Sequence, residues 1–158
     1  MTVHPGRYTA RIDGDFVVFV IGMRINKLWK LPKWIPVARA MGPMMRELTT
    51  HPEKGLLAFE ASQSGRTFTF IQYWRSFDHL ERFARDRDDP HLEAWRRFNR
   101  QVGSSGDVGI YHETYRVEAG AYEAMYGNMP VHGLAKAGEH LPIARRGETA
   151  RERITADA

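Results

Sequence analysis

The chain has 158 residues, of which 42% are hydrophobic and 27% are charged, with 14 Gly, 8 Pro and no Cys. This length predicts one domain that is large enough to bury a core. The composition excludes collagen-like, disulfide-stapled and wholly disordered chains. Without Cys, thiolate-ligated zinc sites and iron–sulfur clusters are excluded as well.

The net charge of +4 is concentrated near the beginning of the chain. Residues 1–39 carry seven Lys or Arg against two Asp, a net of +5, so the remaining residues sum to −1. Because no basic face extends beyond this stretch, we expect no nucleic-acid partner. The longest apolar run, residues 16–23, is too short to span a bilayer, and residues 1–15 lack the apolar stretch of a secretory signal. We therefore expect a cytoplasmic protein.

The pattern of apolar residues predicts six elements in the order strand, helix, strand, strand, helix, strand. They cover residues 16–25, about 34–48, 56–62, 67–74, 77–98 and 108–117. Pro43 lies inside the first helix and should kink or split it. The second helix begins after Ser76 and pauses near Pro90, which suits the first position of a resumed helix.

This order of elements is that of the ferredoxin-like α+β fold, in which both helices cover one face of an antiparallel sheet. We expect an N-terminal arm over residues 1–15 and the ferredoxin-like domain over 16–119. Residues 120–143 are too apolar for a free linker and should pack on the core or on a partner subunit. Residues 144–158 are charged, lack apolar periodicity and are expected to be loose.

The first predicted strand, residues 16–25, has apolar side chains on both of its faces. The uncovered face of the sheet therefore needs a cover, and a second copy of the sheet would supply it. We expect a homodimer whose two sheets enclose an apolar pocket for a small molecule.

Several passages are similar to known proteins. They are residues 73–81 (YWRSFDHLE), 88–95 (DDPHLEAW), 112–115 (HETY), the loop 26–36, the Met-rich helix after it and residues 126–130 (YGNMP). Together they resemble the dimeric α/β-barrel superfamily typified by antibiotic-biosynthesis monooxygenases, and within it a small monooxygenase-like branch with a fungal member in terpenoid biosynthesis. The resemblance implies a dimeric α/β barrel and an oxidoreductase acting on a hydrophobic small molecule, with polycyclic and terpenoid compounds as candidates from secondary metabolism.

Three residues are candidate catalytic groups. His91 follows Pro90 at a helix N-terminus, where the helix dipole favours a neutral imidazole that can accept a proton; the alternative is that it caps the helix. His112 either lines the pocket or meets the helices. Tyr73, like Tyr115, can donate a hydrogen bond to a substrate oxygen or serve as an ordinary strand residue.

Other residues are candidates for substrate binding. Trp74 and Trp95 form either part of the core or an aromatic wall against a flat substrate, and Phe70 shares a strand face with Trp74. Asn26 ends the first strand, where the resemblance places an asparagine of cofactor-independent relatives and of haem degraders.

The seven His residues form no H-x-x-x-H or H-E-x-x-H pattern, and flavin and nicotinamide fingerprints are absent. We expect no cofactor. Haem is the alternative, because the resemblance includes haem-degrading enzymes and haem dehydratases; the position of their axial histidine falls near Trp95, with His91 one turn earlier. A non-catalytic module for ligand binding or dimerisation is a third hypothesis.

The basic segment around Lys27, Trp29, Lys30 and Lys33 has three interpretations. It is an ordinary loop with packed tryptophans and solvated lysines, or it guides an anionic substrate to the barrel, or it contacts an anionic lipid surface.

Overall fold

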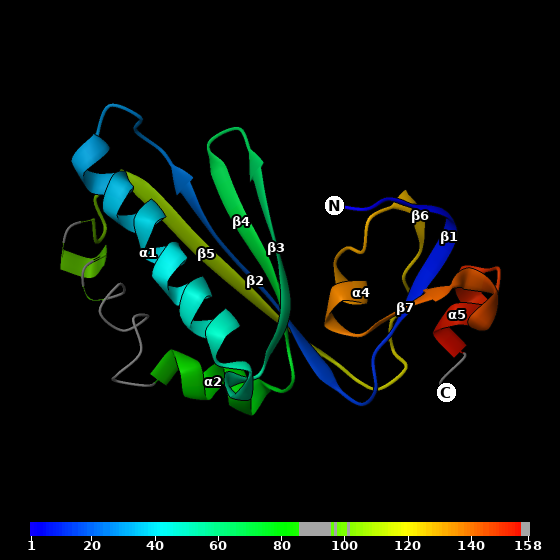
Figure 1. Ribbon diagram of the computed structural model, residues 1–158. Coiled ribbons are helices and arrows are strands. Elements are labelled where there is room, and N and C mark those ends of the chain that lie inside the picture. Colours follow the sequence, from blue (N-terminus) through cyan, green and yellow to red (C-terminus); the bar gives the residue numbers. More distant parts are fainter. Residues whose placement is uncertain (86–95, 97, 101, 156–158) are drawn as a thin grey trace.

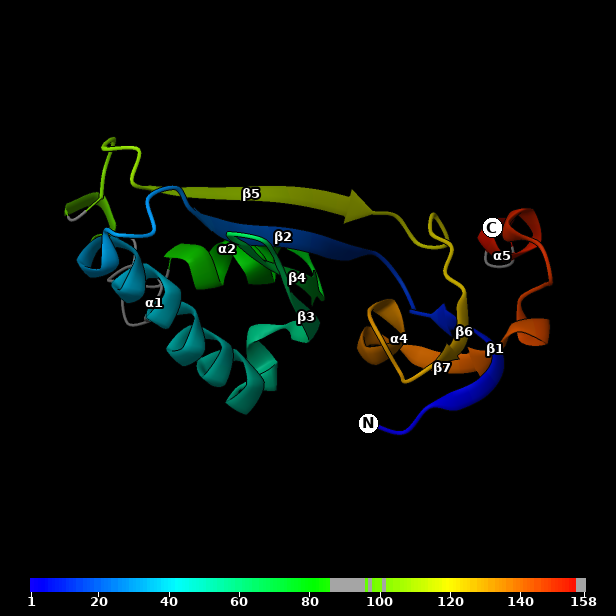
Figure 2. The same ribbon diagram turned by 90° about the horizontal axis from the view of Figure 1, so that it is seen from above.

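The computed structural model describes residues 1–85, 96, 98–100 and 102–155, which contain two antiparallel sheets (Figure 1). The larger sheet has the strand order β3-β4-β2-β5. Its strands are β2 (Phe16–Ile25), β3 (Leu56–Ser64), β4 (Thr67–Trp74) and β5 (Val108–Val117). Helices α1 (Leu31–Thr50) and α2 (Phe77–Arg85) lie on the same face of it (Figure 2). The predicted ferredoxin-like fold is confirmed.

The central strand β2 pairs with β4 on one side and with β5 on the other, both antiparallel. In this register Val17 lies opposite Trp74 and Arg116, whereas Val18 lies opposite Tyr73 and Tyr115. Directly opposite residues point to the same face of a sheet. The register therefore separates the odd-numbered residues of β2, on the helix-covered face, from the even-numbered ones on the other face.

Helix α1 begins at Leu31, earlier than predicted, and it is not split at Pro43, because one helix runs to Thr50 with Pro36 and Pro43 inside it. An interior proline costs a helix about 3 kcal/mol. The helix buries Met44, Met45 and Leu48 against the sheet, and each such side chain contributes about 1.5 to 3 kcal/mol. Packing therefore outweighs the two prolines.

Helix α2 begins after Ser76, as predicted, and the Ser76 hydroxyl accepts a hydrogen bond from the His79 amide at 3.3 Å. Residues 96 and 98–100 are helical, whereas most of the predicted resumption between 91 and 98 lies outside the described residues. None of the described helices is long and apolar enough to cross a membrane.

The main core fills the space between the sheet and the two helices. It consists of Val17, Met44, Met45, Leu48, Trp74, Leu80 and Phe83. Trp74 has no exposed surface and Leu48 has 2%. A second cluster, near the beginning of α1, contains Met23, Ile25, Val102 and Val108 with Trp34 packed against it.

A second sheet, of three strands, was not predicted. The expected N-terminal arm forms β1 (His4–Arg11), which lies between β6 (Tyr126–Met129) and β7 (Glu139–Pro142). An apolar cluster joins the two sheets: Ala10, Ile12, Phe16, Tyr122, Leu134 and Ala135, with Val18, Leu57 and Tyr73 packed against it. The segment after β5 thus covers part of the open face of the larger sheet within the same chain.

The expectation of a loose tail over 144–158 is wrong for the part that the structure describes. The chain forms a short 3-10 helix (Ile143–Arg145) and α5 (Ala150–Thr155). Arg146 and Arg153 are each 6% exposed. Arg146 donates hydrogen bonds to the Ala10 carbonyl and the Tyr122 hydroxyl, and Arg153 to the Glu123 carboxylate. The charged residues led us to expect disorder, but two of these arginines, Arg146 and Arg153, hold the segment against the rest of the chain through hydrogen bonds.

Candidate functional site

A cavity of about 40 Å³ lies between the larger sheet and its two helices. The described residues that line it are Phe19, Ile21, Met41, Met44, Leu48, Gln72, Trp74, Leu80, Phe83 and Ala84. The sequence predicted a pocket on the other side of the sheet, between two copies. This cavity instead lies within one chain, on the helix-covered face.

Gln72 is the polar residue of this lining besides the Trp74 indole, and it is 4% exposed. The indole Nε1 of Trp74 donates to Gln72 Oε1 at 2.9 Å. An indole N–H can only donate, so this bond fixes which end of the amide is oxygen. Gln72 Nε2 therefore points the other way and donates to the Met45 sulfur at 3.5 Å. A thioether is a weak acceptor, so a substrate oxygen would be a better partner for this N–H group.

Two titratable side chains lie against the outside of the cavity wall. The His112 ring is 5.6 Å from the ring of Phe19, centroid to centroid. The Lys54 ammonium lies 5.9 Å from the centroid of the Phe83 ring. His112 is therefore on the cavity side of the sheet, next to Phe19, but it is exposed and is not among the described lining residues.

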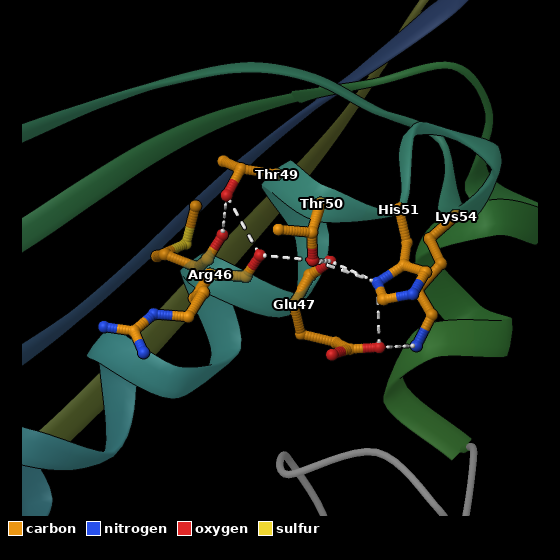
Figure 3. Close-up of polar contacts among 7 residues, drawn as sticks. Arg46, Glu47, Thr49, Thr50, His51 and Lys54 are labelled. Carbon is orange, nitrogen blue, oxygen red and sulfur yellow. Dashed lines mark hydrogen bonds and ion pairs between the residues drawn. The ribbon is translucent and has the colours of Figure 1, made fainter.

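Lys54 belongs to a polar cluster at the end of α1 (Figure 3). Glu47 Oε1 lies 2.9 Å from Lys54 Nζ and 3.2 Å from His51 Nδ1, and the hydrogen bond from Lys54 is the largest cause of the lowered pKa of Glu47. The Thr49 and Thr50 hydroxyls donate to carbonyl oxygens of the last helical turns. We interpret this cluster as stabilising the C-terminal end of α1, which lies beside the cavity wall.

Tyr73 and Tyr115 lie on the opposite face of the sheet and so are not brought to the cavity. Burial raises the pKa of the Tyr73 phenol, with smaller contributions from Tyr126 and Glu60. Tyr115 donates to Glu113, and this hydrogen bond raises the pKa of Tyr115. Both phenols therefore stay protonated to a higher pH than an ordinary tyrosine.

The remaining predicted binding residues lie in different places relative to the cavity. Trp74 lines the cavity, whereas Phe70 packs against Phe59 on the same face without contributing to the described lining. Asn26 lies at the end of β2, where its amide donates to the Gly106 carbonyl at 3.1 Å and holds the loop before β5. His91 and Trp95 lie outside the described residues. The sequence did not lead us to predict Gln72 as a site residue. The signal that could have indicated it is a single amide side chain within an apolar strand.

The described residues do not fit a haem or a metal ion. No group of three His, Asp or Glu stands together in the described part of the chain. No described histidine lines the cavity, so the described lining offers no imidazole as an axial ligand.

Comparison with known proteins places most of the chain in one group. A family model described as "Monooxygenase af470-like" matches residues 16–134, which include the larger sheet and the cavity. Monooxygenase af470 of Aspergillus fumigatus is 29% identical over 152 residues, which cover 78% of this chain and 50% of that protein. The chain therefore spans about half the length of this curated relative.

Solved structures are more distant. SnoaB, a cofactor-independent oxygenase from Streptomyces nogalater, is 12% identical with a TM-score of 0.46, over 64% of this chain and 91% of SnoaB. A protein from Caulobacter crescentus assigned to antibiotic biosynthesis monooxygenases is 12% identical with a TM-score of 0.45, over 63% of this chain and 87% of that one.

Proposed function

The chain belongs to the monooxygenase af470-like family, and from this premise we propose that it oxidises a hydrophobic small molecule with O2 and without a bound cofactor. The substrates that we propose are polycyclic or terpenoid compounds of secondary metabolism. We propose that the enzyme acts on them in the cytoplasm. The observation that carries it is the buried Gln72 amide, which belongs to the otherwise apolar described lining of the cavity and whose Nε2 donates to the Met45 thioether.

An apolar lining with one well-placed polar group is the usual composition of a small-molecule site. Substrates of several rings need about 300 Å³ or more, so the cavity must widen on binding. Met41 and Met44 form part of its wall, and methionine side chains adapt to irregular volumes. Phe19, Trp74 and Phe83 present aromatic surfaces to a flat molecule.

The chemistry follows from these surroundings. A base removes a proton from an activated C–H group of the substrate, and the carbanion passes electrons to O2 to form a peroxide. Loss of water from the peroxide leaves one oxygen atom as a new carbonyl group, so the substrate itself supplies the electrons. Gln72 stabilises the oxyanion of the deprotonated substrate through its N–H group. His112 is the described candidate for the base, reaching the cavity if Phe19 rotates, and His91 is the second candidate.

Oxygen uptake with anthrone, a flat carbon acid, tests this proposal. Anthrone and O2 give anthraquinone and water in equal amounts. We expect the protein to accelerate this reaction after chelation of metals and without added haem or flavin. Q72L should lower the rate by about 100-fold or more, as for loss of an oxyanion donor. Gln63, an exposed glutamine of β3, provides the matched control Q63L.

His112→Asn should lower the rate by about 100-fold or more if His112 is the base, whereas His51→Asn should leave it unchanged. If the rate of H112N is unchanged, His112 is not the base and another residue must remove the proton. If the wild-type protein binds anthrone but does not accelerate oxygen uptake, the non-catalytic binding module is the better description.

The open face of the larger sheet supports a second part of the proposal, that two copies of the chain form a homodimer. Its β2 side chains Val18 and Val20 and its β4 side chain Ile71 are only half-buried. Tyr111 and Tyr115, on the same face, are 38% and 52% exposed. The segment after β5 covers the Val18 end of this face, so we expect the partner's sheet to cover the rest.

A further inference from the structure

The loop between β2 and α1 exposes three large apolar side chains. Leu28, Trp29 and Leu31 are 45%, 72% and 49% exposed, and we call them the Trp29 patch. The loop that carries them lies at the end of the described structure away from the three-stranded sheet (Figures 1 and 2). The patch is also distinct from the residues that line the cavity.

The backbone of this loop is anchored on both sides, so the exposure is part of the fold. The amides of Asn26 and Lys27 both donate to the Asp107 carbonyl, at 3.1 and 3.2 Å. Lys27 Nζ lies 2.7 Å from the Asp107 carboxylate. On the other side, the Trp34 indole donates to the Leu28 carbonyl at 3.0 Å. Trp34 packs in the core while Trp29 is presented to the outside.

The elements that meet at the patch carry cationic residues. Lys27, Lys30 and Lys33 belong to the loop and the first turn of α1, Arg24 to the end of β2, and Arg66 to the neighbouring hairpin turn. The loops that meet here, residues 26–30, 63–66 and 103–107, contain one carboxylate, that of Asp107. Lys27 already pairs with it. Among these described loops and the first turn of α1, basic residues therefore outnumber carboxylates next to the apolar patch.

We propose that the Trp29 patch docks on the surface of an anionic lipid bilayer. Tryptophan is favoured at the boundary between headgroups and acyl chains, and lysines beside it are attracted to anionic headgroups. A short loop with apolar side chains at its tip and cations around them suits a planar interface. The enzyme would thereby work next to the phase in which a hydrophobic substrate accumulates.

Sedimentation of the whole chain with vesicles tests the proposal. Two vesicle types are compared, phosphatidylcholine alone and phosphatidylcholine with about one-third phosphatidylserine. We expect binding to the anionic vesicles, weakened by added salt, and a blue shift of tryptophan emission that is absent in W29F. W29A should lower the vesicle affinity about tenfold, and the double variant K30Q/K33Q should do so by a similar factor.

Two variants in the other part of the molecule serve as matched controls. R145Q/R151Q removes the same charge from exposed positions, and Met125→Ala removes an apolar side chain that is 54% exposed; both should bind vesicles like the wild type. Absence of binding to anionic vesicles at low salt overturns the proposal. So does equal binding by W29A, or binding to polyglutamate but not to vesicles, which would indicate an acidic protein partner.

Discussion

Gln72 and Trp74 form a buried pair whose two polar groups depend on each other. Q72L removes the acceptor of the Trp74 indole at a site where Trp74 has no exposed surface. A buried donor without a partner costs about 1 to 3 kcal/mol, so we expect Q72L to lower the free energy of unfolding by this amount, as measured in urea.

The double variant Q72L/W74F should lose less stability than Q72L and W74F lose in sum, because replacing both partners leaves no polar group unsatisfied. A double variant that is less stable than the sum of the two single variants would contradict this interpretation. Measuring all four proteins also separates the structural role of Gln72 from its proposed role in oxygen chemistry.

Residue-level prediction from the sequence was partly successful. Alternation correctly grouped Phe70 and Trp74 on one strand face, but alternation does not show which face the helices cover. The register places Tyr73 and Tyr115 on the other face. The residues predicted for their chemistry are therefore divided between the two sides of the sheet, and the buried Gln72 amide was not among the predicted site residues.

At the level of elements, the close approach of the β4 backbone and of the Tyr111 ring of β5 to β2 requires a glycine. A Cβ atom on Gly22 would lie 2.5 Å from the Tyr111 ring and 2.7 Å from the Phe68 carbonyl oxygen. The ring can turn aside, but the carbonyl belongs to the backbone of β4. We expect G22A to lower the free energy of unfolding by about 1 to 3 kcal/mol, as measured by denaturant titration.

Gly42 provides the control, because a Cβ atom there has no neighbour within 4 Å and the residue lies in helix α1. G42A should be neutral or more stable by up to about 1 kcal/mol, since alanine favours helix. If both variants lose stability equally, the space around Gly22 is not the cause.

The elements that could be predicted are those with strong local patterns. The long apolar strands β2, β4 and β5 have the bounds that their sequences indicated. Strands β6 and β7 have four residues each, and β1 contains proline, glycine and two arginines. These strands pair with segments that are far away along the chain. A short stretch of sequence therefore does not reveal the pairing.

For the molecule as a whole, Glu60 connects the larger sheet to the segment that covers it. Its Oε1 accepts from the Gly133 amide and the Lys136 ammonium, both at 2.8 Å, and lies 3.1 Å from His132 Nδ1. Burial raises the pKa of Glu60, but the hydrogen bonds from Lys136 and Gly133 outweigh it, and the net shift is downward from 4.5.

A carboxylate with a lowered pKa stabilises the folded state above its ordinary pKa, and this stabilisation is lost as the pH falls through the folded-state value. We therefore expect E60Q to be less stable than the wild type by about 1 to 2 kcal/mol at pH 7. The difference should shrink as the pH falls below 4.5. Thermal unfolding across this range measures it, with exposed Glu118→Gln as control. A difference independent of pH would contradict the role of the charge.

The proposed dimer makes a prediction at the same scale. Tyr115→Glu would add a carboxylate next to Glu113 on the open face, whereas Thr114→Glu would add the same charge to the opposite face of β5. In sedimentation velocity we expect the wild type and T114E as dimers and Y115E shifted towards the monomer of 18.2 kDa. A wild type that sediments as a monomer would contradict the dimer.

The position of β1 has a consequence for the order in which the molecule is completed during synthesis. This strand is synthesised before all the other described elements, yet it pairs with residues 126–129 and 139–142. The larger sheet can close once β5 has emerged, but Ala10, Ile12 and Phe16 still lack their partners Tyr122 and Leu134. Contacts between distant segments form late, and exposed apolar surface and unpaired strand edges favour aggregation. Ribosome-bound chains that end after β5 are therefore the form of this protein most in need of a chaperone.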